Sequence, residues 1–219
     1  SILRAALRTE ELLVMHSAIM DRHDPDKRVN LVMDEWGTWH LGEPGSNPGF
    51  LYQQNTMRDA LVASLHFDLF HRHAERVRMA NIAQMVNVLQ ATVLTDGPRM
   101  VLTPTYWVFF LYAAHQDAQR VDLSIKVEDY AEGLPAVSAT CSQKDGVWTI
   151  SCSNLDPHQA CEVSVSGLPN EVTVRSSQVL SGIAMNSHNT FDSPEQVALK
   201  VLPAEHSETA YATDRAIAF

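Results

Sequence analysis

A glutamate followed closely by two tryptophans is the feature of this sequence that most directly suggests chemistry. Glu35 ends an apolar run within the segment Met33-Asp34-Glu35-Trp36-Gly37-Thr38-Trp39. A carboxylate at the end of a strand can attack the anomeric carbon of a sugar, and a flat indole can stack on a sugar ring. The segment therefore predicts a sugar-cleaving site. The structural alternative is an acid that only caps a loop or pairs with an arginine.

The elements around Glu35 are predicted to alternate between helix and strand. Thr9 begins a helical pattern that ends at Asp24-Pro25, and Val29–Met33 is β-prone. Further along, the pattern predicts a helix with Met57, Leu61, Leu65 and Leu69 on one face, a strand over 76–80, and a helix from Thr103-Pro104 to about His115. Such alternation is typical of βα units with a parallel sheet, and strand alternation predicts that Leu31, Met33 and Glu35 share one face.

The pattern changes near residue 119. Residues 121–127, 147–152 and 161–165 are each strand-like and are separated by turn signals such as Asp145-Gly146. Several short strands at even spacing favour a β-sandwich. We therefore expect an α/β region over residues 1–118 and an all-β region over 119–219.

Composition and charge restrict the partners. The chain has 219 residues, is 45% hydrophobic and carries a formal net charge of −10, which favours a packed core and argues against nucleic-acid partners. Its longest apolar stretch, residues 106–114, is too short to cross a membrane. Three cysteines without a CxxC pair favour free thiols in a reducing, cytoplasmic compartment, with one disulfide and secretion left as alternatives.

Five blocks of sequence, in order, resemble the α-L-arabinofuranosidases of glycoside hydrolase family 51. The first is the segment around Glu35, and the resemblance extends over most of residues 1–118 and more loosely beyond. The other blocks are Asn47-Pro48-Gly49-Phe50-Leu51-Tyr52-Gln53-Gln54-Asn55-Thr56, Arg58-Asp59-Ala60-Leu61-Val62-Ala63, His71-Arg72-His73-Ala74-Glu75-Arg76-Val77 and Met79-Ala80-Asn81-Ile82-Ala83-Gln84-Met85-Val86-Asn87.

The resemblance implies a fold and a set of roles. The fold is the last βα units of a (β/α)₈ TIM barrel followed by a C-terminal, jelly-roll-like β-sandwich. The implied reaction is retaining hydrolysis that releases terminal arabinofuranose, with Glu35 as the nucleophile. Gln84 matches a residue that contacts the sugar, and Trp39 matches an aromatic wall of the pocket. Taken alone, Gln84 reads as an ordinary polar loop residue, and Trp36 is interpreted as packing rather than as a sugar contact.

The chain also departs from the family pattern. Retaining hydrolysis needs a second carboxyl group roughly 5–5.5 Å from the nucleophile. The family supplies it from an Asn-Glu pair before the nucleophile, and residues 1–34 contain no such pair. Asn170-Glu171 lies in a turn of the β region and is not expected to act. We therefore expect an N-terminal polypeptide to complete the barrel and supply the acid/base, and the resemblance also implies a homo-oligomer.

Two competing interpretations of function remain open. The first is a non-catalytic fragment or sugar-binding module, which the missing acid and missing barrel strands favour. The second is a metal-dependent hydrolase, which would use the cluster His66, His71 and His73. No HExxH pattern or cysteine partner accompanies these histidines, so we predict packing roles for them and expect neither a metal nor a cofactor.

Overall fold

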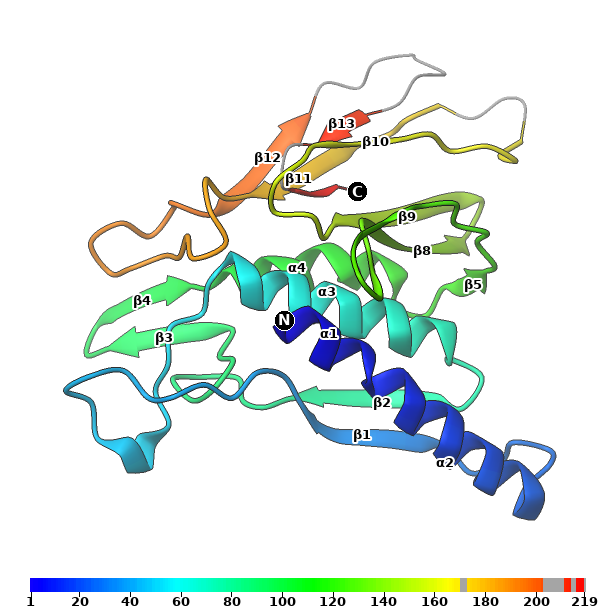
Figure 1. Cartoon of the computed structure of the whole chain (residues 1–219), viewed down its shortest axis with the longest axis horizontal. Coiled ribbons are helices and arrows are strands. Elements are labelled where there is room, and N and C mark those ends of the chain that lie inside the picture. The colour runs from blue at the N-terminus through cyan, green and yellow to red at the C-terminus, as the bar shows by residue number, and fades with distance from the viewer. Residues whose placement is uncertain (170–172, 203–210, 214–215, 219) are drawn as a thin grey trace.

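The computed structural model describes residues 1–169, 173–202, 211–213 and 216–218, and it combines helices with open sheets (Figure 1). The helical elements are α1 (Ile2–Leu7), α2 (Thr9–His23), α3 (Met57–Arg72) and α4 (Pro104–Tyr112), with short 3-10 turns η1 (Pro48–Phe50) and η2 (Ala113–His115). The strands are β1 (Leu31–Trp36), β2 (Val77–Ile82), β3 (Val93–Asp96), β4 (Arg99–Leu102), β5 (Gln119–Val121), β6 (Asp129–Ala131), β7 (Leu134–Pro135), β8 (Val137–Lys144), β9 (Val147–Asn154), β10 (Cys161–Val163), β11 (Ser177–Ser181), β12 (Ala198–Leu202), β13 (Tyr211–Thr213) and β14 (Ala216–Ala218).

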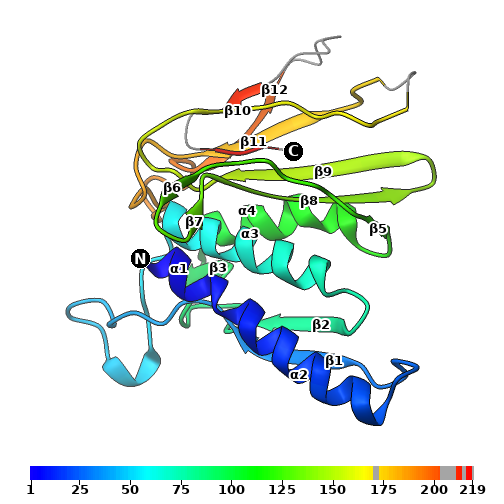
Figure 2. The ribbon, with the colours of Figure 1, turned by 45° about the vertical axis from the view of Figure 1, so that its right-hand side comes forward.

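The strands β1 and β2 form a parallel pair, and α3 is the helix between them in the chain. Their register joins Val32 to Met79 and Trp36 to Ile82. In both ribbon views, α3 and α4 lie between this pair and the larger sheet formed by the later strands (Figures 1 and 2). The arrangement confirms the predicted parallel strands and helices of the N-terminal region.

The helix α3 is the centre of the hydrophobic core. Met57, Leu61, Leu65 and Leu69 follow one another at helical spacing, and all four are buried. Thr56 and Asp59 form a capping box at its N-terminus, which satisfies backbone donors that the first turn leaves unpaired. The predicted apolar face is confirmed, and the capping box fixes where the helix begins.

The larger sheet is antiparallel and contains β12, β11, β14, β9, β8 and β5 in that order. The hairpin of β8 and β9 turns at Asp145 and Gly146, both with positive φ, as the sequence predicts for this dipeptide. The strand predicted over residues 121–127 is wrong in its bounds. In the structure β5 ends at Val121 and pairs only with β8, so the alternating residues after it have no partner strand.

A row of buried hydroxyl groups on β8 and β9 faces the helices. We name this row the hydroxyl seam, and it consists of Ser138, Thr140, Ser142, Ser151 and Ser153. Each group has a helical or turn-borne partner: Asp68 for Ser138, His71 for Thr140, His115 for Ser142 and Ser151, and Ser64 for Ser153. The sheet therefore packs on the helices through paired polar groups as well as through apolar ones.

Burial shifts the protonation of three groups along this seam. Desolvation raises the pKa of Asp68 to about 7, although hydrogen bonds from Ser138 and Tyr112 act in the opposite direction. Desolvation lowers the pKa of His71 and of His115 to about 4.

Among the helices that the structure describes, none combines the length and the apolarity that a membrane crossing requires.

Candidate active site

Glu35 lies at the C-terminal end of β1 and is exposed. Leu31 and Met33 pack against the core, but the register with β2 shifts between Met33 and Trp36. Because of this irregularity, Glu35 does not continue the core-facing row, and the prediction that it shares the face of Leu31 and Met33 is wrong. Among the residues that the structure describes, no ion pair joins Glu35 to an arginine.

Gln84 lies two residues beyond the end of β2 and is also exposed. The backbone N–H of Ala83 donates to the carbonyl of Trp36 at 3.0 Å, which ties the ends of the two strands together. The peptide bond between Ala83 and Gln84 is cis. Since parallel strands end at the same edge of a sheet, the structure brings Glu35 and Gln84 to one edge, where α/β proteins commonly bind ligands.

The two tryptophans near Glu35 have opposite environments. Trp36 is 6% exposed and stacks on Phe109 with ring centroids 5.9 Å apart, so its predicted packing role is confirmed. Trp39 is 70% exposed and lies on the loop that follows β1. The loop therefore presents one indole to solvent, close in sequence to Glu35, while the other indole anchors the strand in the core.

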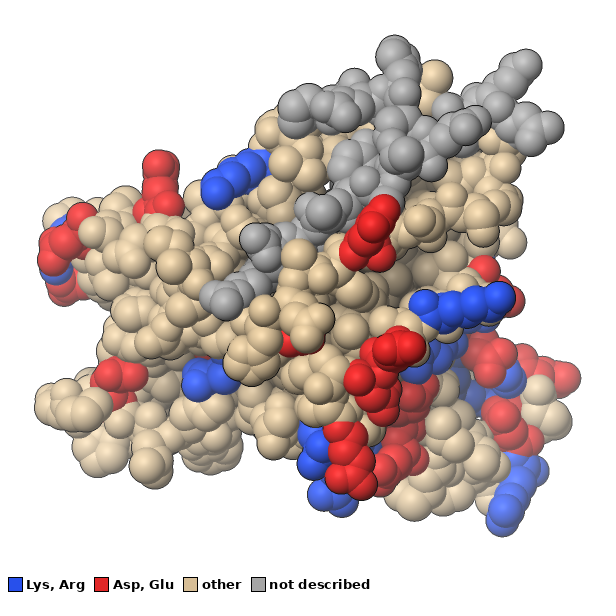
Figure 3. Space-filling model, turned by 45° about the horizontal axis from the view of Figure 1, so that its top comes forward, with Lys and Arg blue, Asp and Glu red and all other residues tan. Residues whose placement is uncertain are grey.

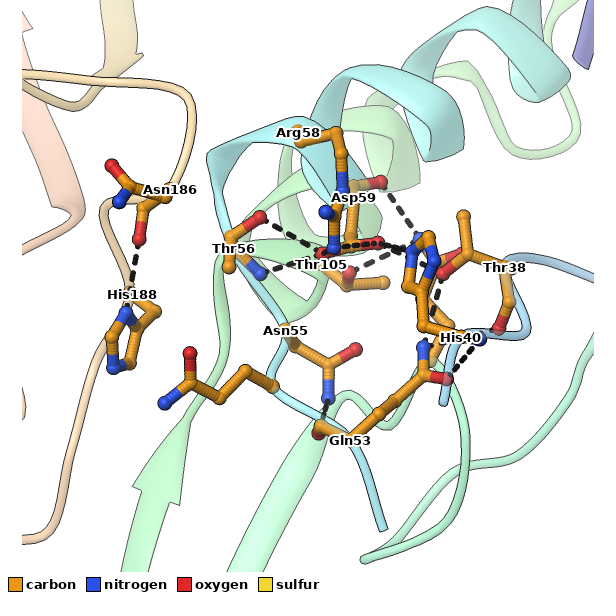
Figure 4. Close-up of polar contacts among 12 residues, drawn as sticks. Thr38, His40, Gln53, Asn55, Thr56, Arg58, Asp59, Thr105, Asn186 and His188 are labelled. Carbon is orange, nitrogen blue, oxygen red and sulfur yellow. Dashed lines mark hydrogen bonds and ion pairs between the residues drawn. The ribbon is translucent and has the colours of Figure 1, made fainter. Parts of the chain in front are cut away.

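A buried polar network holds the loop on both sides of Trp39 (Figure 4). The hydroxyl of Thr38 donates to Asp59 at 2.8 Å, and the Thr38 N–H donates to the side-chain oxygen of Gln90 at 2.8 Å. The His40 N–H donates to the side-chain oxygen of Gln53 at 2.8 Å. Asp59, Gln53 and Gln90 are buried, and sequence reasoning assigned none of them a role. Only Asp59 carries a local signal, because it lies three residues after Thr56 in a capping-box pattern.

His66, His71 and His73, the histidines considered for a metal site, each contact a different polar group of the protein. The ring of His66 lies 2.8 Å from the Val62 carbonyl and 3.2 Å from the Thr9 hydroxyl, and burial lowers its pKa. His73 lies 3.2 Å from a carboxylate oxygen of Glu10, and His71 contacts the Thr140 hydroxyl of the hydroxyl seam. Within the ranges that the structure describes, no group of three or more His, Cys, Asp or Glu side chains is placed to hold a metal ion.

Two hollows on the molecule have linings that leave out the predicted site residues. One hollow is lined by Gly37, Thr38 and α1, another by Tyr52, Asn55 and Phe191, and neither is lined by Glu35, Gln84 or Trp39. On the face shown in Figure 3, charged side chains of both signs gather toward one end.

Asn170-Glu171, the Asn-Glu pair of the sequence, lies outside the described residues. The three cysteines are free thiols, as the sequence predicts.

Comparison with known proteins gives the family. Residues 34–213 match the sequence model of the alpha-L-arabinofuranosidase C-terminal domain, and the chain belongs to this family. It is 45% identical over 196 residues to an intracellular exo-alpha-L-arabinofuranosidase of Bacteroides ovatus, a match that covers 87% of this chain and 38% of the relative.

Solved structures agree. The crystal structure of the glycoside hydrolase family 51 arabinofuranosidase from Xanthomonas axonopodis pv. citri is 48% identical, with a TM-score of 0.89, and the match covers 97% of this chain and 45% of that one. A thermostable family 51 enzyme from Thermotoga petrophila, 21% identical with a TM-score of 0.80, covers 98% of this chain and 48% of its own and shows the same fold. The chain thus spans less than half the length of these relatives.

Proposed function

We propose that this chain is part of a retaining, exo-acting α-L-arabinofuranosidase in which Glu35 is the nucleophile. The observation that carries the proposal is the exposed carboxylate of Glu35 at the C-terminal edge of the β1–β2 pair, beside the end of β2 that leads to Gln84. The names of the relatives from Bacteroides ovatus and Xanthomonas axonopodis support the substrate class, which is a terminal arabinofuranosyl group.

The proposed reaction follows from the chemistry of a carboxylate. The Glu35 oxygen attacks the anomeric carbon and forms the glycosyl-enzyme bond. At the same time the bond from the anomeric carbon to the leaving-group oxygen breaks, and a second carboxyl group protonates the leaving-group oxygen. Water then cleaves the glycosyl-enzyme, and the same second group acts as the base. We assign that second group to a segment outside this chain. The amide of Gln84 would bind sugar hydroxyls, and Trp39 would supply an apolar wall.

An N-terminal polypeptide that completes the barrel is part of the proposal. Apolar side chains of α2 point away from the core: Leu12, Met15 and Ile19 are all exposed and recur along one side of the helix. The exposed face of the β1–β2 pair is also partly apolar, with Val32 and Met79 on it. The chain spans 38% of the length of one relative and 45% of the length of another. A surface that buries these groups would also bring the missing acid/base to Glu35.

Three further parts of the proposal concern organisation. We assign residues 1–118 to the end of a (β/α)₈ barrel and residues 119–219 to a jelly-roll-like β-sandwich, supported by β5, which begins the larger sheet at Gln119. We assign the protein to a reducing compartment, supported by the free cysteines and by relatives named intracellular. Family resemblance supports a homo-oligomer, which light scattering of the purified assembly would test.

The test replaces Glu35 in the assembled enzyme. Glu35→Ala should abolish cleavage of an aryl α-L-arabinofuranoside, and added azide should restore release of the aryl group while forming an arabinosyl azide of inverted anomeric configuration, because azide fills the space of the nucleophile. Glu195→Gln, a change of an exposed carboxylate in a loop of the β region, is the matched control and should keep wild-type rates.

The outcome separates the two leading functions. Full activity of Glu35→Ala, or an azide product that keeps the substrate configuration, would refute the assignment of the nucleophile. A stable wild-type protein that binds arabinose, co-purifies with no second chain and cleaves nothing would instead support the non-catalytic sugar-binding module, which the short span of the chain relative to its relatives favours.

A further inference from the structure

The residues on both sides of Trp39 are fixed although Trp39 itself is exposed. Thr38 is 4% exposed, and His40 is partly buried with its ring Nε2 atom 3.3 Å from an oxygen of Asp59. Gly37, which precedes them, has a φ of 130°, so the chain turns sharply directly after Trp36. The indole of Trp39 is thus carried on a short segment, Gly37–His40, whose position depends on the contacts of its neighbours.

Two buried amides satisfy the backbone of this segment. Gln90 accepts from the Thr38 N–H and donates to the Asp59 carbonyl at 2.7 Å and to the Thr105 hydroxyl at 3.2 Å. Gln53 donates to the Thr38 carbonyl at 3.1 Å and accepts from the His40 N–H. Side chains therefore replace the strand partners that these backbone groups lack, and they tie the segment to the first turns of α3 and α4.

Asp59 links the segment to the start of α3 through its two different oxygens. Its Oδ1 atom accepts from the Thr38 hydroxyl at 2.8 Å and faces His40. Its Oδ2 atom accepts from the Thr56 N–H at 2.8 Å and from the Thr56 hydroxyl at 3.0 Å. Arg58 donates to this oxygen at 3.1 Å and, more distantly, to Oδ1 at 3.4 Å. Asp59 is wholly buried, so its carboxylate depends on these donors and holds them firmly in return.

The division between the two oxygens separates two roles. Hydrogen bonds to Oδ2 cap the helix, which is a structural role that many aspartates have. The hydrogen bond to Oδ1 serves no helix, because Thr38 lies in the loop after β1 (Figure 4). A carboxylate mounted on a rigid helix is a suitable anchor for a loop that must present one side chain in a fixed position.

We propose that Asp59 is a positioning residue for Trp39: it acts through Thr38 to hold the indole where the sugar ring binds. The proposal rests on the proposed function in so far as Trp39 contacts the substrate. Trp36 anchors the end of β1 separately, so displacement of the Gly37–His40 segment should affect sugar binding more than the attack by Glu35.

Two threonine substitutions provide a matched test. Thr38→Val and Thr56→Val each remove one hydroxyl donor to Asp59, and both threonines are 4% exposed. In the assembled enzyme, Thr38→Val should raise KM for an aryl arabinofuranoside about tenfold with kcat within about twofold of wild type. Thr56→Val should lower the melting temperature and leave KM unchanged. Equal effects of the two changes on KM would overturn the proposal.

A second measurement uses no substrate. The assembled enzyme is labelled with 5-fluorotryptophan, and the ¹⁹F resonance of Trp39 is assigned by its loss in Trp39→Phe. Thr38→Val and Asp59→Asn should both shift or broaden this resonance, and Thr56→Val should leave it in place. An unmoved resonance in Thr38→Val would refute the positioning role even if the enzyme cleaves arabinofuranosides, whereas a moved resonance in an enzyme without activity would refute only the proposed function.

Discussion

Val32 on β1 and Met79 on β2 are register partners in the parallel pair, and their side chains are 42% and 56% exposed. Two apolar side chains side by side on an open sheet face are typical of a surface that another part of a protein covers. The pair also leaves strand edges free to accept further strands.

Val32→Lys or Met79→Lys should therefore weaken assembly with the proposed N-terminal polypeptide, because a buried lysine without a partner is costly. We expect the dissociation constant to rise about tenfold or more, measured by size-exclusion chromatography with light scattering. Val201→Lys, at an exposed valine on β12, is the control and should assemble normally. Unchanged assembly of the Val32 and Met79 variants would exclude this face from the interface.

Substitutions of Trp36 and Trp39 should have different effects, the first on the free energy of unfolding and the second on sugar binding. Trp36→Ala leaves a cavity among Phe67, Phe70 and Phe109 and should lower the free energy of unfolding by about 3–5 kcal/mol. Trp39→Ala should change it by no more than about 0.5 kcal/mol, because that indole is exposed, yet should weaken sugar binding. Urea titrations and KM values measured on both variants check this contrast, and a reversed pattern would contradict the assignment of the pocket wall.

Gly37→Ala should disturb the loop after β1 more than Gly45→Ala does. A Cβ atom at Gly37 would lie 3.0 Å from the side-chain oxygen of Gln90, the atom that accepts from the Thr38 N–H. Gly45, on the same loop, also has positive φ but has open space around it, so Gly45→Ala should cost only about 1–2 kcal/mol of backbone strain. Gly37→Ala should lower the urea midpoint further and raise KM. Equal costs for the two variants would show that the contact with Gln90 is unimportant.

Acid should destabilise the packing of the sheet on the helices. The pKa of His71 and of His115 is lowered from 6.5 to about 4, so the stability that their neutral rings contribute is present above pH 6.5 and is lost as the pH falls through 4. The pKa of Asp68 is raised from 3.8 to about 7, so burial of its charged carboxylate destabilises the native state above pH 7. This cost is relieved as the pH falls from 7 toward 3.8, which opposes the effect of the histidines. Between pH 6.5 and 4 the unfolded chain binds protons on His71 and His115 that the native chain does not bind, and the lowered pKa of buried His66 acts in the same direction. The native chain binds one extra proton on Asp68, which offsets only part of this difference, so stability falls on acidification.

Urea midpoints at pH 7 and pH 5 measure this loss. Changing both His71 and His115 to Gln should remove most of the fall, since the lowered pKa of His66 and the opposing effect of Asp68 then remain. His16→Gln, at an exposed position on α2, should leave the fall unchanged. If the double variant loses as much stability as wild type between these pH values, the hydroxyl seam does not determine the response to acid.

The helices and the parallel strands were predictable from the sequence because local signals specify them. Thr103 before Pro104 gives a capping residue and a first-turn proline, and the structure starts α4 there with the Thr103 hydroxyl accepting from the Tyr106 N–H. The apolar period of α3 likewise reports a buried face. The packing of Trp36 was predictable too, since a large indole next to a strand end is readily buried.

The supports of the site were not predictable in the same way. Gln53, Asp59 and Gln90 converge on Thr38 from distant positions, and a lone glutamine carries no spacing signal. The face on which Glu35 lies was also hidden, because a register shift breaks the alternation on which the prediction depended. Both failures arise from long-range contacts that a local pattern does not encode.

The position of β14 in the larger sheet has a consequence for biosynthesis. This strand lies between β11 and β9, although both of those strands precede it in the chain. While the ribosome is still adding residues after β12, β9 and β11 each have an open hydrogen-bonding edge that another nascent chain could pair with. Slower synthesis at low temperature, or a chaperone that covers these edges, should therefore increase the yield of correctly folded chain.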